Sequence, residues 1–211
     1  MSTYKILAYI SGFSAIIPLV VGLIRMKHFS AYSIWLFILV TVSFSIDLVS
    51  YILVEKQISS LPIVHQFFLW QVPIVWMIFE KSSPVKQLII RIVRLITLLS
   101  FVLMITYLWG NWMNERMVIP VAWVSTISII FISILYVFDW VTYGDINLKK
   151  DSLPLFLFGI ILIYECSIIP TFAAYESMLR DVYRVKLVVY IFFNLGLTYI
   201  FYKQNKINTN G

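Results

Sequence analysis

The stretch from Leu153 to Tyr175 sets the strongest limit on the fold of this chain. It contains a single charged residue, Glu165, among apolar and small polar residues. A helix of about 20 apolar residues is long enough to cross the hydrocarbon core of a bilayer. The stretch therefore predicts a membrane-spanning helix with an acid inside it. Because an ionisable group at this depth is costly, we expect Glu165 to face other helices and to have a function.

Six further apolar runs give the rest of the chain the same character. Hydrophobic residues make up 61% of the 211 residues and charged residues only 12%, against roughly 25% charged residues in soluble proteins. We predict an all-α polytopic membrane protein in which residues 1–211 form one domain, a single bundle of seven transmembrane helices. The predicted spans are 6–24, 31–54, 61–79, 87–109, 117–138, 153–175 and 183–202.

Because the seven predicted spans take up most of the chain, several classes of function are excluded. The spans leave no length for a soluble catalytic, nucleotide-binding or nucleic-acid-binding domain. The net charge of +6 comes from basic residues that stand singly or in pairs near span ends, a placement typical of topology determinants and not of a nucleic-acid surface. One cysteine and two histidines predict neither an internal disulfide nor a histidine-rich metal site. We expect no enzyme activity, cofactor, metal or nucleic-acid partner.

Basic residues divide unevenly between the two sides of the predicted bundle. Seven spans place the termini on opposite sides, and ten Lys and Arg residues fall on the C-terminal side against six on the other. The positive-inside rule then predicts a bacterial inner-membrane protein with its N-terminus outside and its C-terminus in the cytoplasm. Arg91 and Arg94 are candidates for contact with anionic inner-leaflet lipids, or for a docking face for a cytoplasmic partner.

Polar side chains in four spans lie at similar depths. A rise of 1.5 Å per residue places Asp47, Gln71, Glu165 and Asn194 about 12 to 16 Å from the outer span ends. Together with Tyr190, they predict a polar layer near the bilayer midplane. Small polar groups also hold membrane helices together without any ligand. The layer therefore predicts either a binding site or well-bonded packing.

Glu165 needs a partner from another helix, because the residues on its own helical stripe are apolar. Candidate partners in the same layer are Tyr190, Asn194 and Gln71, and we expect the carboxyl group to be protonated. Lys186 is a poor partner, because antiparallel helices tilt their side chains in opposite directions. We expect Lys186 to reach the outer surface instead.

His65 is predicted to join Lys186 at the outer rim of the bundle. It stands near the start of the third predicted span, five residues after Ser60. Polar residues at such positions commonly mark the membrane interface. We therefore interpret His65 as a polar residue of the helix end and not as a ligand.

Five motifs carry a resemblance that covers nearly the whole chain. They resemble the small seven-helix membrane proteins of Bacteroidota, a family without an established activity that is often encoded near sensor kinases. The resemblance implies a seven-helix fold and a signalling context. The motifs are IIPLVVGLIRMKHFS, SIDLVSYIL, HQFFLWQ, LPLFLFGIILIYECSIIPTF and VYIFFNLGLTYIFY.

A weak internal repeat suggests a second resemblance. Helices two and six each hold one acid at similar depth, and helices three and seven end similarly, in MIFEK and YIFYK. A three-plus-one-plus-three arrangement resembles the PQ-loop and SWEET transporters. Their Pro-Gln motif is absent. A microbial rhodopsin would carry its retinal lysine in the middle of helix seven, where this chain has Asn194, so no retinal is expected.

Two functional hypotheses follow. The first is a non-enzymatic sensor, receptor-like protein or accessory signalling component that passes its signal to a membrane or cytoplasmic partner. The alternative is a small transporter in which Asp47 and Glu165 are proton or solute sites. Loss of pH-dependent uptake on neutralising either acid would favour the transporter.

Overall fold

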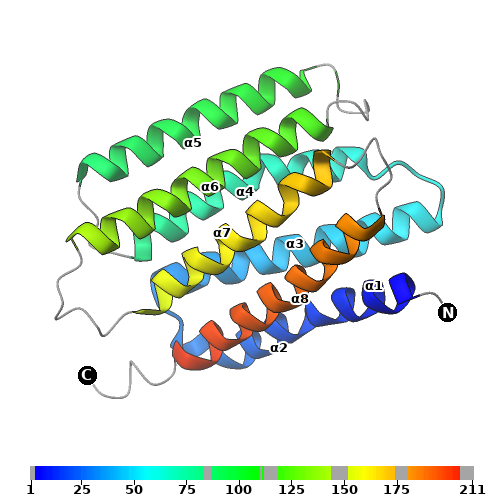
Figure 1. Ribbon diagram of the computed structural model, residues 1–211, viewed down its shortest axis with the longest axis horizontal. Coiled ribbons are helices and arrows are strands. Elements are labelled where there is room, and N and C mark those ends of the chain that lie inside the picture. Colours follow the sequence, from blue (N-terminus) through cyan, green and yellow to red (C-terminus); the bar gives the residue numbers. More distant parts are fainter. Residues whose placement is uncertain are drawn as a thin grey trace.

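The computed structural model describes residues 3–82, 87–109, 111, 118–143, 152–173 and 180–204. This part of the chain is helical and contains no strand (Figure 1). Its helices are α1 (Thr3–Ser14), α2 (Ile16–Arg25), η1 (Met26–His28), α3 (Ala31–Glu55), α4 (Leu61–Ser82), α5 (Gln87–Leu108), α6 (Val118–Tyr143), α7 (Ser152–Ala173) and α8 (Arg180–Lys203).

Together these elements form seven spans that are long and apolar enough to cross a membrane. The predicted seven-helix membrane fold is therefore confirmed. The first span, residues 9–28, runs through α1, α2 and η1. It is interrupted at Ala15 because the nitrogen of Pro18 has no hydrogen to donate to the carbonyl of Ser14. Pro73 and Pro170, by contrast, lie inside the continuous helices α4 and α7.

Several helix ends differ from the predicted spans. The helix α6 continues to Tyr143, beyond the predicted end at residue 138, and α4 continues to Ser82, beyond 79. The helix α8 begins at Arg180, before the predicted start at 183. The reason is that a helix continues into the interfacial region, where water and lipid head groups accept polar side chains. Residues 117, 174 and 175 of the predicted spans lie outside the described part of the chain.

Six spans form a ring in which the helices follow one another in chain order. The helix α3 packs against α4, α4 against α6, α6 against α7, and α7 against α8, which also contacts α1 and α2. A smaller contact between α2 and α3 closes the ring, and α5 lies outside it against α4 and α6. Figure 1 shows consecutive spans running in opposite directions and the two termini at opposite ends of the bundle.

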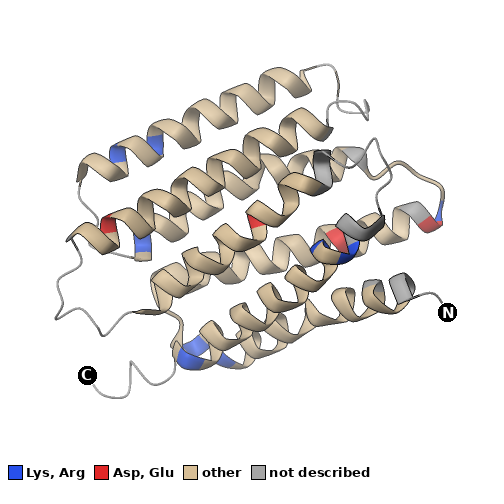
Figure 2. Ribbon diagram, in the orientation of Figure 1, with Lys and Arg blue, Asp and Glu red and all other residues tan. Residues whose placement is uncertain are grey.

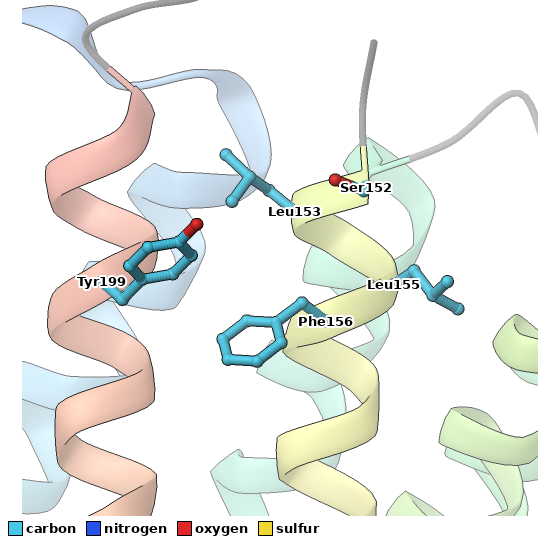
Figure 3. A pocket seen from close by; sticks show the side chains of 5 residues that line it. All are labelled: Ser152, Leu153, Leu155, Phe156 and Tyr199. Carbon is cyan, nitrogen blue, oxygen red and sulfur yellow. The ribbon is translucent and has the colours of Figure 1, made fainter. Parts of the chain in front are cut away.

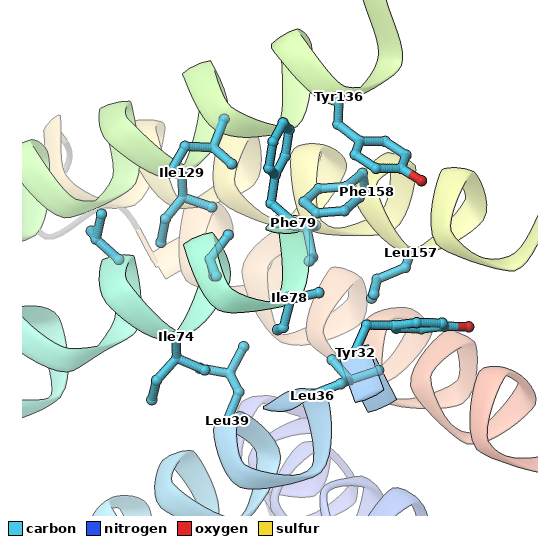
Figure 4. Packing of buried hydrophobic residues seen from close by; sticks show 14 of the residues in the cluster. Tyr32, Leu36, Leu39, Ile74, Ile78, Phe79, Ile129, Tyr136, Leu157 and Phe158 are labelled. Atoms are coloured by element: carbon cyan, nitrogen blue, oxygen red, sulfur yellow. The ribbon is translucent and has the colours of Figure 1, made fainter. Parts of the chain in front are cut away.

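The end of the bundle where α8 finishes is filled by large apolar side chains, which we call the apolar block. Its members come from the first turns of α3 and α7 and the last turns of α4 and α8. Tyr136 of α6 stacks on Phe158 with 4.1 Å between ring centroids, and Phe79 meets both rings edge-on. Figure 4 shows part of this packing. The fully buried members are Leu36, Ile78, Phe79, Leu157, Phe158 and Phe201.

Charged residues gather near the helix ends, as Figure 2 shows. Two acids lie farther inside the spans: Asp47, eight residues before the end of α3, and one acid part-way along α7. Glu165 is the only acid in that helix. The placement of the polar groups inside the spans therefore decides where a functional site could lie.

Candidate functional site

Glu165 lies at the centre of a buried polar cluster that joins three helices. Its side chain is 2% exposed, and Gln71 Nε2 on α4 donates a hydrogen bond to Glu165 Oε1 at 2.9 Å. The hydroxyl of Thr126 on α6 also hydrogen-bonds to the carboxyl group. Gln71 Oε1 in turn accepts a hydrogen bond from Ser125 Oγ at 3.3 Å. We call these four residues the core cluster, and they confirm Gln71 as a predicted partner of Glu165.

The apolar stripe of α7 explains how the acid reaches this position. Phe158, Ile161 and Ile168 share a helical face with Glu165, and all three are buried. Packing of the stripe against α4 and α6 carries the carboxyl group into the interior with it. Buried polar groups must be hydrogen-bonded to avoid a large desolvation cost. The amide and hydroxyl groups of α4 and α6 meet that requirement.

A second polar group, the lateral cluster, joins α3 and α8 and consists of Ser43, Asp47, Lys186 and Tyr190. The Tyr190 hydroxyl donates to Asp47 Oδ2 at 3.5 Å and also hydrogen-bonds to Ser43. Lys186 interacts electrostatically with Asp47 and less strongly with Glu165. Unlike Glu165, Asp47 is exposed on the surface of the chain.

Of the three alternative partners predicted for Glu165, the structure shows Gln71, while Asn194 and Tyr190 bond elsewhere. Asn194 Nδ2 donates to Ser14 Oγ on α1 at 2.9 Å, and Tyr190 binds Asp47. The cause is the rotation of α7, which turns Tyr164 toward α8. The Tyr164 ring stacks on Phe193 with 4.5 Å between centroids and lies 5.7 Å from Tyr190. The predicted single layer is therefore divided into the core and lateral clusters.

The two residues predicted at the outer rim behave differently. Lys186 is half-buried and interacts electrostatically mainly with Asp47 instead of reaching the outer surface. His65 has no exposed surface and is not a residue of an open rim. It shares a helical face with Leu69 and Val72, which are also buried. That face packs into the bundle and takes the imidazole with it.

Three hydroxyl partners of the buried polar groups, Ser14, Ser125 and Thr126, were not anticipated from the sequence. Ser125 and Thr126 lie seven and eight residues into α6, a rise of about 11 Å, which is close to the depth of Gln71. Ser14 of α1 is the partner of Asn194. Isolated Ser and Thr residues are common in membrane helices, where they bond to their own backbone. Only their shared depth with the amides and the acid could have identified them.

Arg91 and Arg94, near the start of α5, lie in different surroundings. Arg94 Nη2 lies 2.7 Å from Glu80 Oε1 and its guanidinium lies 5.9 Å from the centroid of the Trp76 ring. Arg91 is exposed. Both partners of Arg94 belong to α4, so this arginine ties α5 to its neighbour. Arg91 keeps the predicted role as a candidate for lipid contact or partner docking.

No group of three or more His, Cys, Asp and Glu residues that could hold a metal occurs in the described ranges. Comparisons with protein-family models, curated proteins and solved structures found no match. The resemblances to the Bacteroidota family and to the PQ-loop and SWEET transporters therefore stay predictions. The chemistry of the two clusters has to support any functional proposal.

Proposed function

We propose that this integral membrane protein is a non-enzymatic sensor or accessory signalling component, with the lateral cluster as the part that receives the signal. Seven apolar spans fit a multi-pass protein in contact with lipid. The lateral cluster offers a carboxylate, an ammonium group and a phenol within one small region. Such a region suits recognition of a small polar signal or of a polar side chain on a partner protein.

The exposure of Asp47 is the observation that carries this proposal. The residue is exposed although it lies eight residues inside the end of α3 at Glu55, a depth of about 12 Å. A charged carboxyl group facing lipid at such a depth is costly. Tyr190 and Lys186 interact with one side of Asp47, and we infer that water or a polar partner reaches its exposed side. By contrast, the buried and fully bonded core cluster is suited to holding α4, α6 and α7 together.

The apolar block supports a site that opens toward one side only. It fills the bundle at the end where α8 finishes, and its fully buried members have less than 2% of their surface exposed. A transported polar solute would have to pass through this packing. A sensor needs only a shift in helix packing, which interdigitated side chains transmit well.

One observation favours the alternative, a small transporter. Lys186 interacts electrostatically with both Asp47 and Glu165, and Tyr164, the residue before Glu165 in α7, contacts Tyr190 of the lateral cluster. These contacts could connect the two acids as successive proton or solute sites. A transporter must then expose Asp47 or Glu165 to both sides of the membrane in turn.

Cysteine accessibility distinguishes these functions. In a Cys166→Ser background, which lacks any native cysteine, Asp47→Cys and Leu48→Cys are treated with a charged, membrane-impermeant thiol reagent. Leu48 is the matched control, because it is 49% exposed at the same depth but points in a different direction. The reagent is applied to intact cells and, separately, to inverted membrane vesicles.

A sensor predicts modification of the Asp47→Cys variant from one side only, with the Leu48→Cys variant protected by lipid. Modification of the Asp47→Cys variant from both sides would favour the transporter. Protection of both variants would contradict water access and reduce the lateral cluster to packing. Equal modification of both variants would contradict a confined site.

A further inference from the structure

A groove lies between α7 and α8 at the end of the bundle where α8 finishes (Figure 3). Its volume is about 560 Å³, within the range of about 300 to 1,000 Å³ that is usual for small-ligand sites. In Figure 3, Leu153 and Phe156 extend from α7 toward Tyr199 of α8, and the Phe156 and Tyr199 rings meet edge-on at 5.7 Å. The lining residues are Ser152, Leu153, Leu155, Phe156 and Tyr199.

The groove ends toward the middle of the bundle, where the two helices touch. A Cβ atom placed on Gly196 would lie 2.9 Å from Ile160 Cδ1 and 3.8 Å from Phe156 Cε1. The absence of a side chain at Gly196 thus permits the close contact. Nearer the helix ends, Phe156 and Tyr199 are 42% and 46% exposed. The groove is therefore lined mainly by apolar side chains and lies near the start of α7 and the end of α8.

Two basic side chains lie at the same end of the bundle as the groove, one of them against the lining residue Tyr199. Lys203 Nζ lies 5.7 Å from the centroid of the Tyr199 ring, and the Arg25 guanidinium lies 5.4 Å from that of Tyr202. Such cation–π contacts orient a cation without neutralising it. In the part of the chain that the structure describes, neither cation forms an ion pair, and no acid lines the groove.

We propose that this groove binds one anionic phospholipid, with an acyl chain against Phe156 and Tyr199 and the head-group phosphate between Arg25 and Lys203. The apolar lining suits a hydrocarbon chain, and two uncompensated cations at the surface suit a negative head group. A zwitterionic head group would bring its own positive charge toward these cations. The proposal does not depend on the proposed signalling function.

The test measures lipid binding to the full chain. Native mass spectrometry of the detergent-solubilised protein is carried out with phosphatidylglycerol and with phosphatidylcholine. Arg25→Gln combined with Lys203→Gln removes the two cations. The matched control for the loss of one cation, Lys81→Gln, removes an exposed basic residue of α4 at the same end of the bundle. Thermal unfolding in phosphatidylcholine verifies that each variant is folded.

We expect the wild type to prefer phosphatidylglycerol. Each basic residue near a membrane surface contributes about fivefold to the binding of anionic lipid, so the groove variant should lose about 25-fold in affinity. The control should stay within about twofold, and phosphatidylcholine binding should not change. If the double variant does not fold, Lys203→Gln alone should still lose about fivefold.

Three results would overturn the proposal. An equal loss in the Lys203→Gln and Lys81→Gln variants would mean that any basic residue at this end attracts the lipid. Absence of a preference for phosphatidylglycerol would remove the role of charge. Equal binding of the chain-free head group, glycerophosphoglycerol, would show that the apolar groove contributes nothing.

Discussion

At the scale of single residues, the core cluster is sensitive to charge at Glu165 and tolerant of a neutral isostere. Glu165→Gln keeps an oxygen that can accept from Gln71 Nε2, so we expect a loss of about 1 kcal/mol or less in the free energy of unfolding. Glu165→Lys places a cation against the amide donor and should prevent stable folding. Thermal unfolding and the size-exclusion profile of the purified variants in detergent measure both effects.

The control for this prediction is the neighbouring residue Cys166, which is exposed. Cys166→Ala should behave as the wild type. An intermediate variant, Glu165→Ala, leaves the Gln71 amide without its acceptor and should cost about 1 to 3 kcal/mol. Comparable yield and stability of Glu165→Gln and Glu165→Lys would contradict a buried, bonded acid.

The partners of Glu165 show what the sequence can predict at this scale. Depth is readable from residue counts, because a helix rises by a constant amount per residue, and depth correctly related Gln71 to Glu165. The direction in which a side chain points around the helix axis is harder to predict, because each residue turns the helix by about 100°. That turn makes Tyr164 the neighbour of α8. The sequence alone therefore could not exclude Asn194 as a partner.

At the scale of helices, the contact between α2 and α3 depends on Gly22. A Cβ atom there would lie 2.6 Å from Phe37 Cδ2. The Phe37 ring cannot easily move, because Phe29 and Phe201 pack against it. We expect Gly22→Ala to destabilise the protein by about 1 to 3 kcal/mol through overpacking. Thermal unfolding in detergent measures the loss.

Two variants make this prediction specific to the close contact. Phe37→Leu in the Gly22→Ala background should recover part of the stability, because it removes the clashing ring. Gly159 is the control glycine, since a Cβ atom there meets nothing within 4 Å. Gly159→Ala should be neutral or stabilising by up to about 1 kcal/mol. Equal loss at both glycines would attribute the effect to something other than the contact with Phe37.

The attachment of α5 to the ring offers a separate prediction. Ser100 Oγ and Ser128 Oγ lie 2.6 Å apart and link α5 to α6. Each hydroxyl also bonds to a carbonyl of its own helix, so replacing one leaves little unsatisfied. A double-mutant cycle with Ser100→Ala and Ser128→Ala should give a coupling energy of about 0.6 kcal/mol. A coupling near zero would mean that packing alone holds α5.

At the scale of the whole molecule, length and hydropathy predict the spans but not their neighbours. Inside a bilayer the backbone N–H and C=O groups must be hydrogen-bonded within the helix itself, because no water is available. A long apolar run therefore predicts a membrane helix directly. The contacts between helices depend on small and polar residues. Because such residues occur in many of the spans, they do not identify which helices are neighbours. The ring order, the position of α5 outside it, and the separation of two polar clusters therefore appear only in the structure.

The orientation of the bundle is the prediction that belongs to the whole chain. Seven spans place the termini at opposite ends, and the excess of basic residues on the C-terminal side predicts a cytoplasmic C-terminus. A fluorescent protein fused after Gly211 should fluoresce, whereas alkaline phosphatase fused there should be inactive. Alkaline phosphatase inserted in the loop between α3 and α4, at residues 57–59, serves as the opposite control and should be active. Inverted activities would reverse the orientation, and active phosphatase at both sites would contradict the five spans between residue 59 and the C-terminus.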